Sequence, residues 1–192
     1  MGMQIIGKVS AFIFMLLCGV SSCFSKNCLK GGIKIFLFGM LLTVVTHLID
    51  LVLNTRLAIN FGILHLLGLS LVLWYFLKRL PNLAVLVLSA VILFCSFFVS
   101  SIHLPYLFPF GITDSSFYSS DYYPLIPYSA IVLIGAVLGR VLYQKKESLF
   151  RFSLPDNLLS FIGRHSLVFY LFHQVVILAF LYLLFPQQGW SK

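Results

Sequence analysis

Long apolar runs separated by short charged links dominate the chain. Between successive Asp, Glu, Lys and Arg residues, the long uncharged stretches are 9–25, 35–49, 57–77, 80–113, 122–139 and 165–191. About 20 mostly apolar residues cross the hydrocarbon core of a bilayer as a helix. The pattern therefore predicts an all-α, polytopic membrane bundle of about six transmembrane helices. Their expected ranges are about 3–22, 33–53, 59–77, 81–101, 124–140 and 165–185.

The segment before the last predicted helix has a different pattern. Residues 148–163 mix apolar side chains with Arg151, Asp156 and Asn157, and Pro155 interrupts them. This mixture is typical of a helix that lies in the membrane interface. We therefore expect a single transmembrane domain over residues 1–192, with residues 144–163 forming a cytoplasmic interfacial link.

Composition and charge narrow the class of protein. Hydrophobic residues make up 60% of the chain and charged residues 9%, which excludes a soluble globular domain and a disordered chain. The net charge of +8 does not indicate nucleic-acid binding, because ten of the 13 basic residues lie on or beside alternate links. Such links face the cytoplasm. Six spans with the first link inside then place both termini outside.

Cysteine and histidine spacing gives no metal site. Cys18, Cys23, Cys28 and Cys95 form no CxxC pair, and we interpret them as packing residues. No two His residues have HxxxH spacing. We therefore expect no metal.

Polar side chains inside the apolar spans are the candidates for chemistry, since ionisable groups are costly at membrane depth. They recur at spacings of three and four, which places them on one face of each helix. The three groups are Thr43, His47, Asp50 and Asn54; Gly62, His65 and Gly68; and Ser166, Tyr170 and His173 with Gln174 beside them.

The helical rise places these groups at similar depths. At about 1.5 Å per residue, His47 lies about 21 Å from the inner boundary, His65 about 9 Å from the outer one and His173 about 12 Å from the inner one. His103 lies at the outer end of the fourth helix, beside a loop that carries Asp114 and Asp121. The sequence thus predicts a polar pocket in the outer half of the bundle.

Simpler interpretations stand beside this one. A lone His in a membrane helix can hydrogen-bond a neighbouring helix without further function. Tyr122 is a candidate ligand contact or an aromatic of the membrane interface. The cluster Arg140, Lys145 and Lys146 is either a topology signal or a phosphate site.

Five strings occur in the same order in one known family: FGILH at 61–65, LGL at 67–69, SDYYPLIPY at 120–128, IGRHSL at 162–167 and YLFHQ at 170–174. By these strings the chain resembles the heparan-alpha-glucosaminide N-acetyltransferase-like membrane proteins, most of them bacterial. The resemblance runs from about residue 10 to about residue 185, and the two most specific strings are those around Asp121 and His173.

The resemblance implies transfer of an acetyl group from cytosolic acetyl-CoA across a bacterial inner membrane to an amino sugar or another small acceptor. Basic groups on the inner face would hold the phosphates of CoA, and an imidazole would act as general base. The catalytic candidates are His65, His173 and Asp121; the cofactor-binding candidates are Arg164, Lys145 and Lys146; and the acceptor-binding candidates are His47, His103, Tyr122 and Gln174.

The family also opens with a helix that carries an Asp-x-x-Arg-Gly string, which this sequence does not contain. We therefore expect a start codon assigned too late or a shortened member. A non-catalytic binding or transport protein and an inactive fragment stay open as alternatives. A homo-oligomer is compatible with the sequence.

Overall fold

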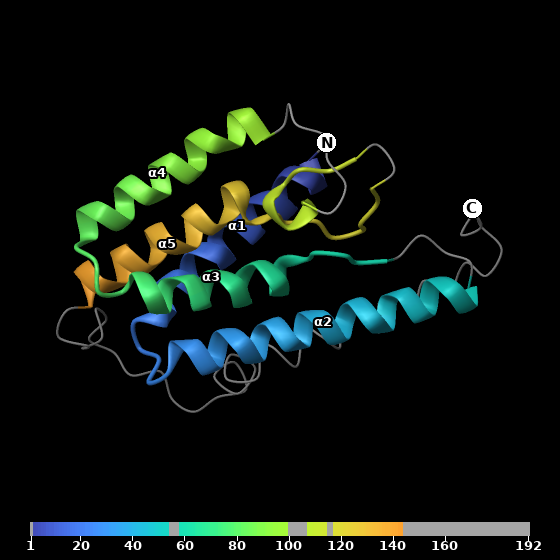
Figure 1. Ribbon diagram of the computed structural model, residues 1–192, viewed down its shortest axis with the longest axis horizontal. Coiled ribbons are helices and arrows are strands. Elements are labelled where there is room, and N and C mark those ends of the chain that lie inside the picture. Colours follow the sequence, from blue (N-terminus) through green and yellow to red (C-terminus); the bar gives the residue numbers. More distant parts are fainter. Residues whose placement is uncertain (1, 54–57, 100–106, 115–116, 144–192) are drawn as a thin grey trace.

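The described part of the chain is helical (Figure 1). The computed structural model describes residues 2–53, 58–99, 107–114 and 117–143. Within these ranges five α-helices and one short 3-10 helix follow one another. They are α1 (Gly2–Ser22), α2 (Cys28–Leu53), α3 (Ile63–Leu77), α4 (Asn82–Val99), η1 (Phe108–Phe110) and α5 (Leu125–Leu142).

The all-helical membrane architecture predicted from the sequence is confirmed. In the described ranges, α1, α2, α4 and α5 are each long and apolar enough to cross a membrane, whereas α3 is a shorter apolar helix of 15 residues. Five of the six expected spans fall in these ranges, and four of them are long spans, whereas the third, α3, is shorter than expected. The sixth predicted helix and the interfacial link at 144–163 lie outside the described residues.

Helix α2 begins at Cys28, five residues earlier than expected. Asn27 caps it, since the Asn27 side-chain oxygen accepts the backbone N–H of Lys30 at 3.2 Å. Lys30 and Lys34 consequently lie within the first two turns of the helix. Long lysine side chains reach water from such positions, so the charges do not exclude a helix there.

Helix α3 begins at Ile63, four residues later than expected. The preceding residues 58–62 are not helical, because their backbone groups are hydrogen-bonded to α2 and to the segment 118–123 instead of to each other. An apolar run alone does not distinguish such a segment from a helical turn.

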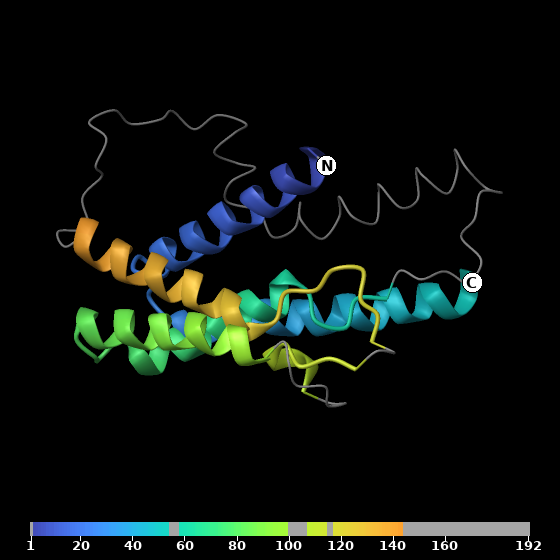
Figure 2. The same ribbon diagram turned by 90° about the horizontal axis from the view of Figure 1, so that it is seen from above.

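The helices run back and forth, so that the connections collect at two ends of the bundle (Figures 1 and 2). Links 23–27 and 78–81 lie at the same end as the last turn of α5. We call it the basic end, after Lys26, Lys78, Arg79 and Arg140, which line one pocket there. Residues 58–62 and the described parts of 107–124 lie at the opposite end, the loop end.

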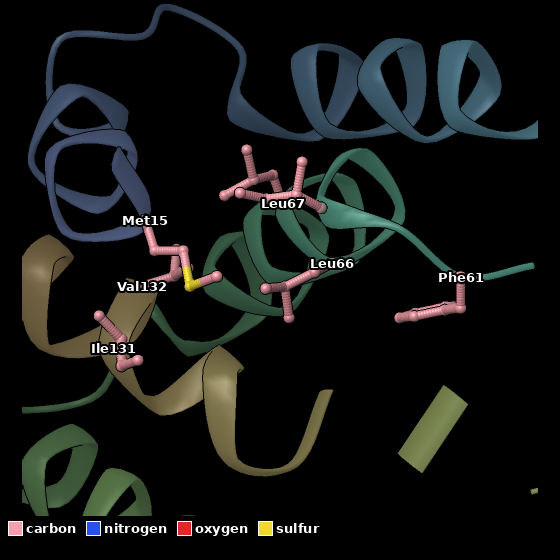
Figure 3. Close-up of a cluster of buried hydrophobic side chains, with 7 residues drawn as sticks. Met15, Phe61, Leu66, Leu67, Ile131 and Val132 are labelled. Carbon is pink, nitrogen blue, oxygen red and sulfur yellow. The ribbon is translucent and has the colours of Figure 1, made fainter. Parts of the chain in front are cut away.

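Helices α3 and α5 form the centre of the described bundle. Helix α2 packs on α3, whereas α1 and α4 pack on α5. Side chains from three of these helices meet in one core cluster, with Met15 of α1 between Leu66 of α3 and Val132 of α5 (Figure 3). By contrast, only 11% of the α4 span is buried, and it presents side chains such as Phe97 outward. A lipid-facing helix has this character.

Small residues let the helix backbones approach closely. A Cβ on Gly135 of α5 would overlap the carbonyl oxygen of Leu16 in α1, and a Cβ on Gly68 of α3 would lie 2.6 Å from the backbone nitrogen of Phe36 in α2. In a bilayer, helices associate mainly through such close packing. Both glycines are therefore required by the contacts between helices.

Candidate functional site

A pocket of about 580 Å³ opens at the basic end, between the α1–α2 link, the last turn of α3 and the last turn of α5. Four cationic side chains line it, those of Lys26, Lys78, Arg79 and Arg140, together with the indole of Trp74. None of the described residues that line it carries a carboxylate. The volume falls within the roughly 300–1,000 Å³ of small-molecule sites. The pocket therefore suits an anionic ligand, above all a phosphate ester.

Arg140 holds the wall of this pocket together. Its guanidinium donates hydrogen bonds to the carbonyl oxygens of Lys78 and Leu80, at 2.8 and 2.9 Å, and to the side-chain oxygen of Asn82 at 2.8 Å. It also lies 4.7 Å from the ring centre of Trp74. The two carbonyls belong to the α3–α4 link, so Arg140 fastens α5 to that link. The sequence left two interpretations of the Arg140 charge, a topology signal or a phosphate site. These hydrogen bonds give Arg140 a structural role as well.

The thiol of Cys23 lies in the same pocket. Its sulfur donates a hydrogen bond to the Ala136 carbonyl of α5 at 3.3 Å. Burial raises the pKa of Cys23 above its ordinary value. The group therefore stays a thiol near neutral pH, which agrees with a packing role and not with a nucleophile.

At the loop end, two segments distant in the sequence lie side by side. The backbone N–H groups of Ser120 and Tyr123 donate to the carbonyl oxygens of Ala58 and Phe61, at 3.0 and 3.1 Å. Phe61 and Tyr122 thereby form a parallel β-bridge. We call the paired segments 58–63 and 118–123 the latch. The latch connects the start of α3 to the entry of α5.

Asp121 joins the latch to the first turn of α3. Its Oδ2 accepts the backbone N–H of Ile63 at 3.1 Å, and Ile63 is the first residue of the helix. A carboxylate in this position pairs an N–H that the helix cannot pair and interacts favourably with the helix dipole. A Cβ on Gly62 would lie 2.5 Å from the same oxygen, so a larger residue there would displace the Asp121 carboxylate from this position. Burial raises the pKa of Asp121, and the Ile63 N–H partly opposes this rise.

His65 is buried in the same turn, with 2% of its surface exposed. Its Nδ1 accepts the backbone N–H of Gly62 at 3.3 Å, so Nε2 carries the proton of the neutral ring and faces Thr43 Oγ1 at 3.4 Å. The ring stacks on Phe61, with centroids 5.3 Å apart, and its edge meets Phe36. Both nitrogens are thus engaged within the protein. This geometry favours a structural role over direct contact with a substrate.

The polar face predicted on α2 is directed at the latch and the start of α3. Thr43 meets His65, Thr46 Oγ1 accepts the N–H of Ile59 at 3.2 Å, and Asp50 Oδ2 accepts the N–H of Ala58 at 2.9 Å. The common face expected for Thr43, His47 and Asp50 is therefore confirmed. Asn54 lies outside the described residues.

His47 is the exposed member of that face. Its Nε2 lies 2.9 Å from Oδ1 of Asn60, and the Asn60 amide nitrogen donates to the Tyr118 carbonyl at 2.7 Å. With Oδ1 as the acceptor, His47 carries its proton on Nε2. Within the described part of the chain Nδ1 has no hydrogen-bond partner, so its lone pair can accept from another donor. The ring of His47 can therefore contact a ligand, whereas the ring of His65 cannot.

The depths of the two histidines also differ from those expected. His65 lies level with Thr43, and His47 lies level with Asn60, one helical turn nearer the loop end. An extended residue advances about 3.3 Å and a helical residue about 1.5 Å. Because residues 58–62 are extended, the chain carries His65 about one turn deeper than a helix beginning at Ile59 would.

Tyr122, a predicted acceptor-binding residue, supports the latch. Its hydroxyl donates to the Phe108 carbonyl of η1 at 2.7 Å, and its ring lies 5.0 Å from that of Phe117. Burial raises the pKa of Tyr122 to about 12. The hydroxyl is therefore protonated at any physiological pH and already has an acceptor.

Several predicted site residues lie outside the described part of the chain. Within the described ranges, no three His, Cys, Asp or Glu side chains come together in a way that would hold a metal ion. Sequence reasoning missed Asn60 and Trp74, although each had a signal: Asn60 is an amide in an apolar run, and Trp74 is an indole four residues before Lys78. The predicted site residues outside the described ranges are His103, Lys145, Lys146, Arg164, His173 and Gln174.

Comparison with known protein families matches most of the chain. The family model described as heparan-alpha-glucosaminide N-acetyltransferase, catalytic, matches residues 1–175. Searches of the curated proteins and of the solved structures found no match. The matched range includes the four basic residues of the pocket as well as both segments of the latch.

Proposed function

The chain belongs to the heparan-alpha-glucosaminide N-acetyltransferase catalytic family, and we propose that it is a membrane-embedded acetyltransferase. In this proposal it takes the acetyl group from acetyl-CoA at the basic end and transfers it to an amino sugar or another envelope acceptor at the loop end. The basic pocket is the observation that carries the proposal, because it has the size of a small-molecule site and all the charged side chains among its described lining residues are cationic.

The chemistry of the donor fits this pocket. CoA carries a 3′-phosphate and a pyrophosphate, which pair with ammonium and guanidinium groups through charge-assisted hydrogen bonds. Lys26, Lys78 and Arg79 are the described groups that we assign to these phosphates, since Arg140 already donates to three protein oxygens. Lys145, Lys146 and Arg164 stay predicted contributors from the part of the chain that follows.

The transfer itself needs one base and no covalent intermediate. The acceptor nitrogen or oxygen attacks the thioester carbonyl carbon, the bond from carbon to sulfur breaks, and the CoA thiolate leaves and takes up a proton. A base removes the proton of the attacking group. Because both nitrogens of His65 have partners, we assign the base to His173. His65 and Asp121 then position the start of α3, while His47 contributes to binding the acceptor.

The orientation follows from the positive charges. Ends of membrane helices rich in Lys and Arg face the cytoplasm, where acetyl-CoA is made. We therefore assign the basic end to the cytoplasmic side of a bacterial inner membrane and the loop end to the outside. This arrangement places the donor and the acceptor on opposite sides of the bundle.

The experiment is transfer of labelled acetyl groups from acetyl-CoA in membranes that contain the protein. Replacing both Lys78 and Arg79 by Ala should raise the KM for acetyl-CoA by roughly 10- to 100-fold, since each removes a charged hydrogen bond to phosphate. Lys30→Ala is the matched control, because Lys30 lies at the same end outside the pocket. His173→Ala should lower kcat. Absence of transfer and of acetyl-CoA binding by the unmodified protein would refute the proposal.

A further inference from the structure

Ser70 in the middle of α3 has an unpaired hydroxyl. Its side chain is fully buried, and within the part of the chain that the structure describes its Oγ has no hydrogen-bond partner. A buried polar group without a partner costs folding stability, so such groups are rare and call for a physical explanation.

Two other buried helix hydroxyls in the described chain, those of Ser22 and Ser89, are paired within their own helix. A hydroxyl in a helix commonly donates to the carbonyl three or four residues earlier. Ser22 does so to Gly19 at 2.6 Å, and Ser89 does so to Val85 at 2.9 Å. Ser70 could donate in the same way to a carbonyl of the preceding turn, but its hydroxyl does not form this hydrogen bond. Its hydroxyl is therefore available to a group that approaches from another direction.

Ser70 lies on α3 between the basic pocket and the loop end. It is four residues before Trp74, so the two side chains lie on one face of α3, about 6 Å apart along the axis. Trp74 lines the basic pocket, and Gly62 and His65 begin the helix at the loop end. Ser70 consequently lies one turn beyond the inner wall of the pocket, toward the latch.

We propose that the Ser70 hydroxyl donates a hydrogen bond to the carbonyl oxygen of the acetyl thioester when the donor is bound. The inference rests on the proposed function: with the phosphates held at the basic end and the acceptor arriving from the loop end, the acetyl group must lie between them, at the depth of Ser70. Ser70 itself does not line the pocket, whereas Trp74 does, so the arm of the donor reaches Ser70 only after buried side chains such as Trp74 move. No covalent bond to Ser70 forms or breaks.

The test compares the binding of acetyl-CoA and of free CoA, which has no acetyl carbonyl, by calorimetry on the purified full chain. In Ser70→Ala the dissociation constant for acetyl-CoA should rise roughly 3- to 10-fold, the range for one neutral hydrogen bond, while that for CoA stays unchanged. Ser89→Ala is the matched control, since Ser89 is equally buried and its hydroxyl is already paired. Ser70→Ala removes an unpaired group, so the thermal midpoint should not fall.

The outcomes separate the two proposals. If the wild type binds both ligands and Ser70→Ala binds them with the same affinities, Ser70 is a packing residue and the inference is refuted while the acetyltransferase proposal stands. Equal weakening of both ligands would also refute it, because the acetyl carbonyl would not be the group recognised. If the wild type binds neither ligand, the acetyltransferase proposal fails, and the inference about Ser70 fails with it.

Discussion

Replacement of His65 distinguishes a structural role from a catalytic one. The ring occupies the third position of α3 and accepts the N–H of the capping residue Gly62, which is the role that Glu or Gln has in a capping box. His65→Gln should therefore keep this hydrogen bond and lose only the ring contacts with Phe61 and Phe36. We expect a loss of about 1–2 kcal/mol in the free energy of unfolding. His65→Ala leaves a cavity and a buried unpaired N–H, and should cost about 3–5 kcal/mol.

Both variants are measured by urea unfolding in detergent and by labelled acetyl transfer in membranes. If His65 only positions the start of α3, the Gln variant should retain activity within a few-fold of the wild type. A general base contributes roughly 10²–10⁴-fold to the rate. A Gln variant that is as stable as expected but has lost transfer by 100-fold or more would refute the structural assignment. A Gln variant as unstable as the Ala variant would refute the capping geometry.

Three further predictions concern the latch, the helix contacts and the basic pocket. Asp121→Asn should preserve the α3 cap, whereas Asp121→Ala should lower the free energy of unfolding by about 1 kcal/mol. Since burial raises the pKa of Asp121, the wild type should gain stability relative to Asp121→Asn as the pH falls toward about 4, and should lose this gain as the pH rises through the raised pKa. Unfolding measured below and above the raised pKa tests this direction. Gly135→Ala should push α1 from α5 and cost about 1–3 kcal/mol. Gly7→Ala, with nothing within 4 Å of its added Cβ, should not destabilise the protein in the same assay, because alanine favours a helix more than glycine does. In a variant with the other three cysteines replaced, Cys23 should react with maleimide at neutral pH more slowly than a free thiol, because its partial burial raises its pKa. A faster reaction would contradict this direction of the pKa shift.

The two histidines near the latch show why sequence spacing leaves roles open. Both were candidates on the same grounds, an imidazole at membrane depth on a polar helix face. The structure buries His65 between Phe61 and Phe36, with both nitrogens engaged, and leaves His47 exposed. The difference arises from residues 58–62, whose extended backbone brings Phe61 over the ring of His65. No local pattern in the sequence encodes that contact.

By itself, the sequence determined the all-helical membrane class, four long spans close to their observed positions, and the polar face of α2. These properties follow from apolar length and from helical periodicity, which are local. Only the tertiary structure decided that Lys26, Lys78 and Arg79 line one pocket with Trp74, and that Asp121 caps α3 across 58 residues of chain. It also decided that the hydroxyl of Ser70 has no partner. Pockets, caps between distant segments and unpaired groups depend on which surfaces meet, and packing between distant elements determines that.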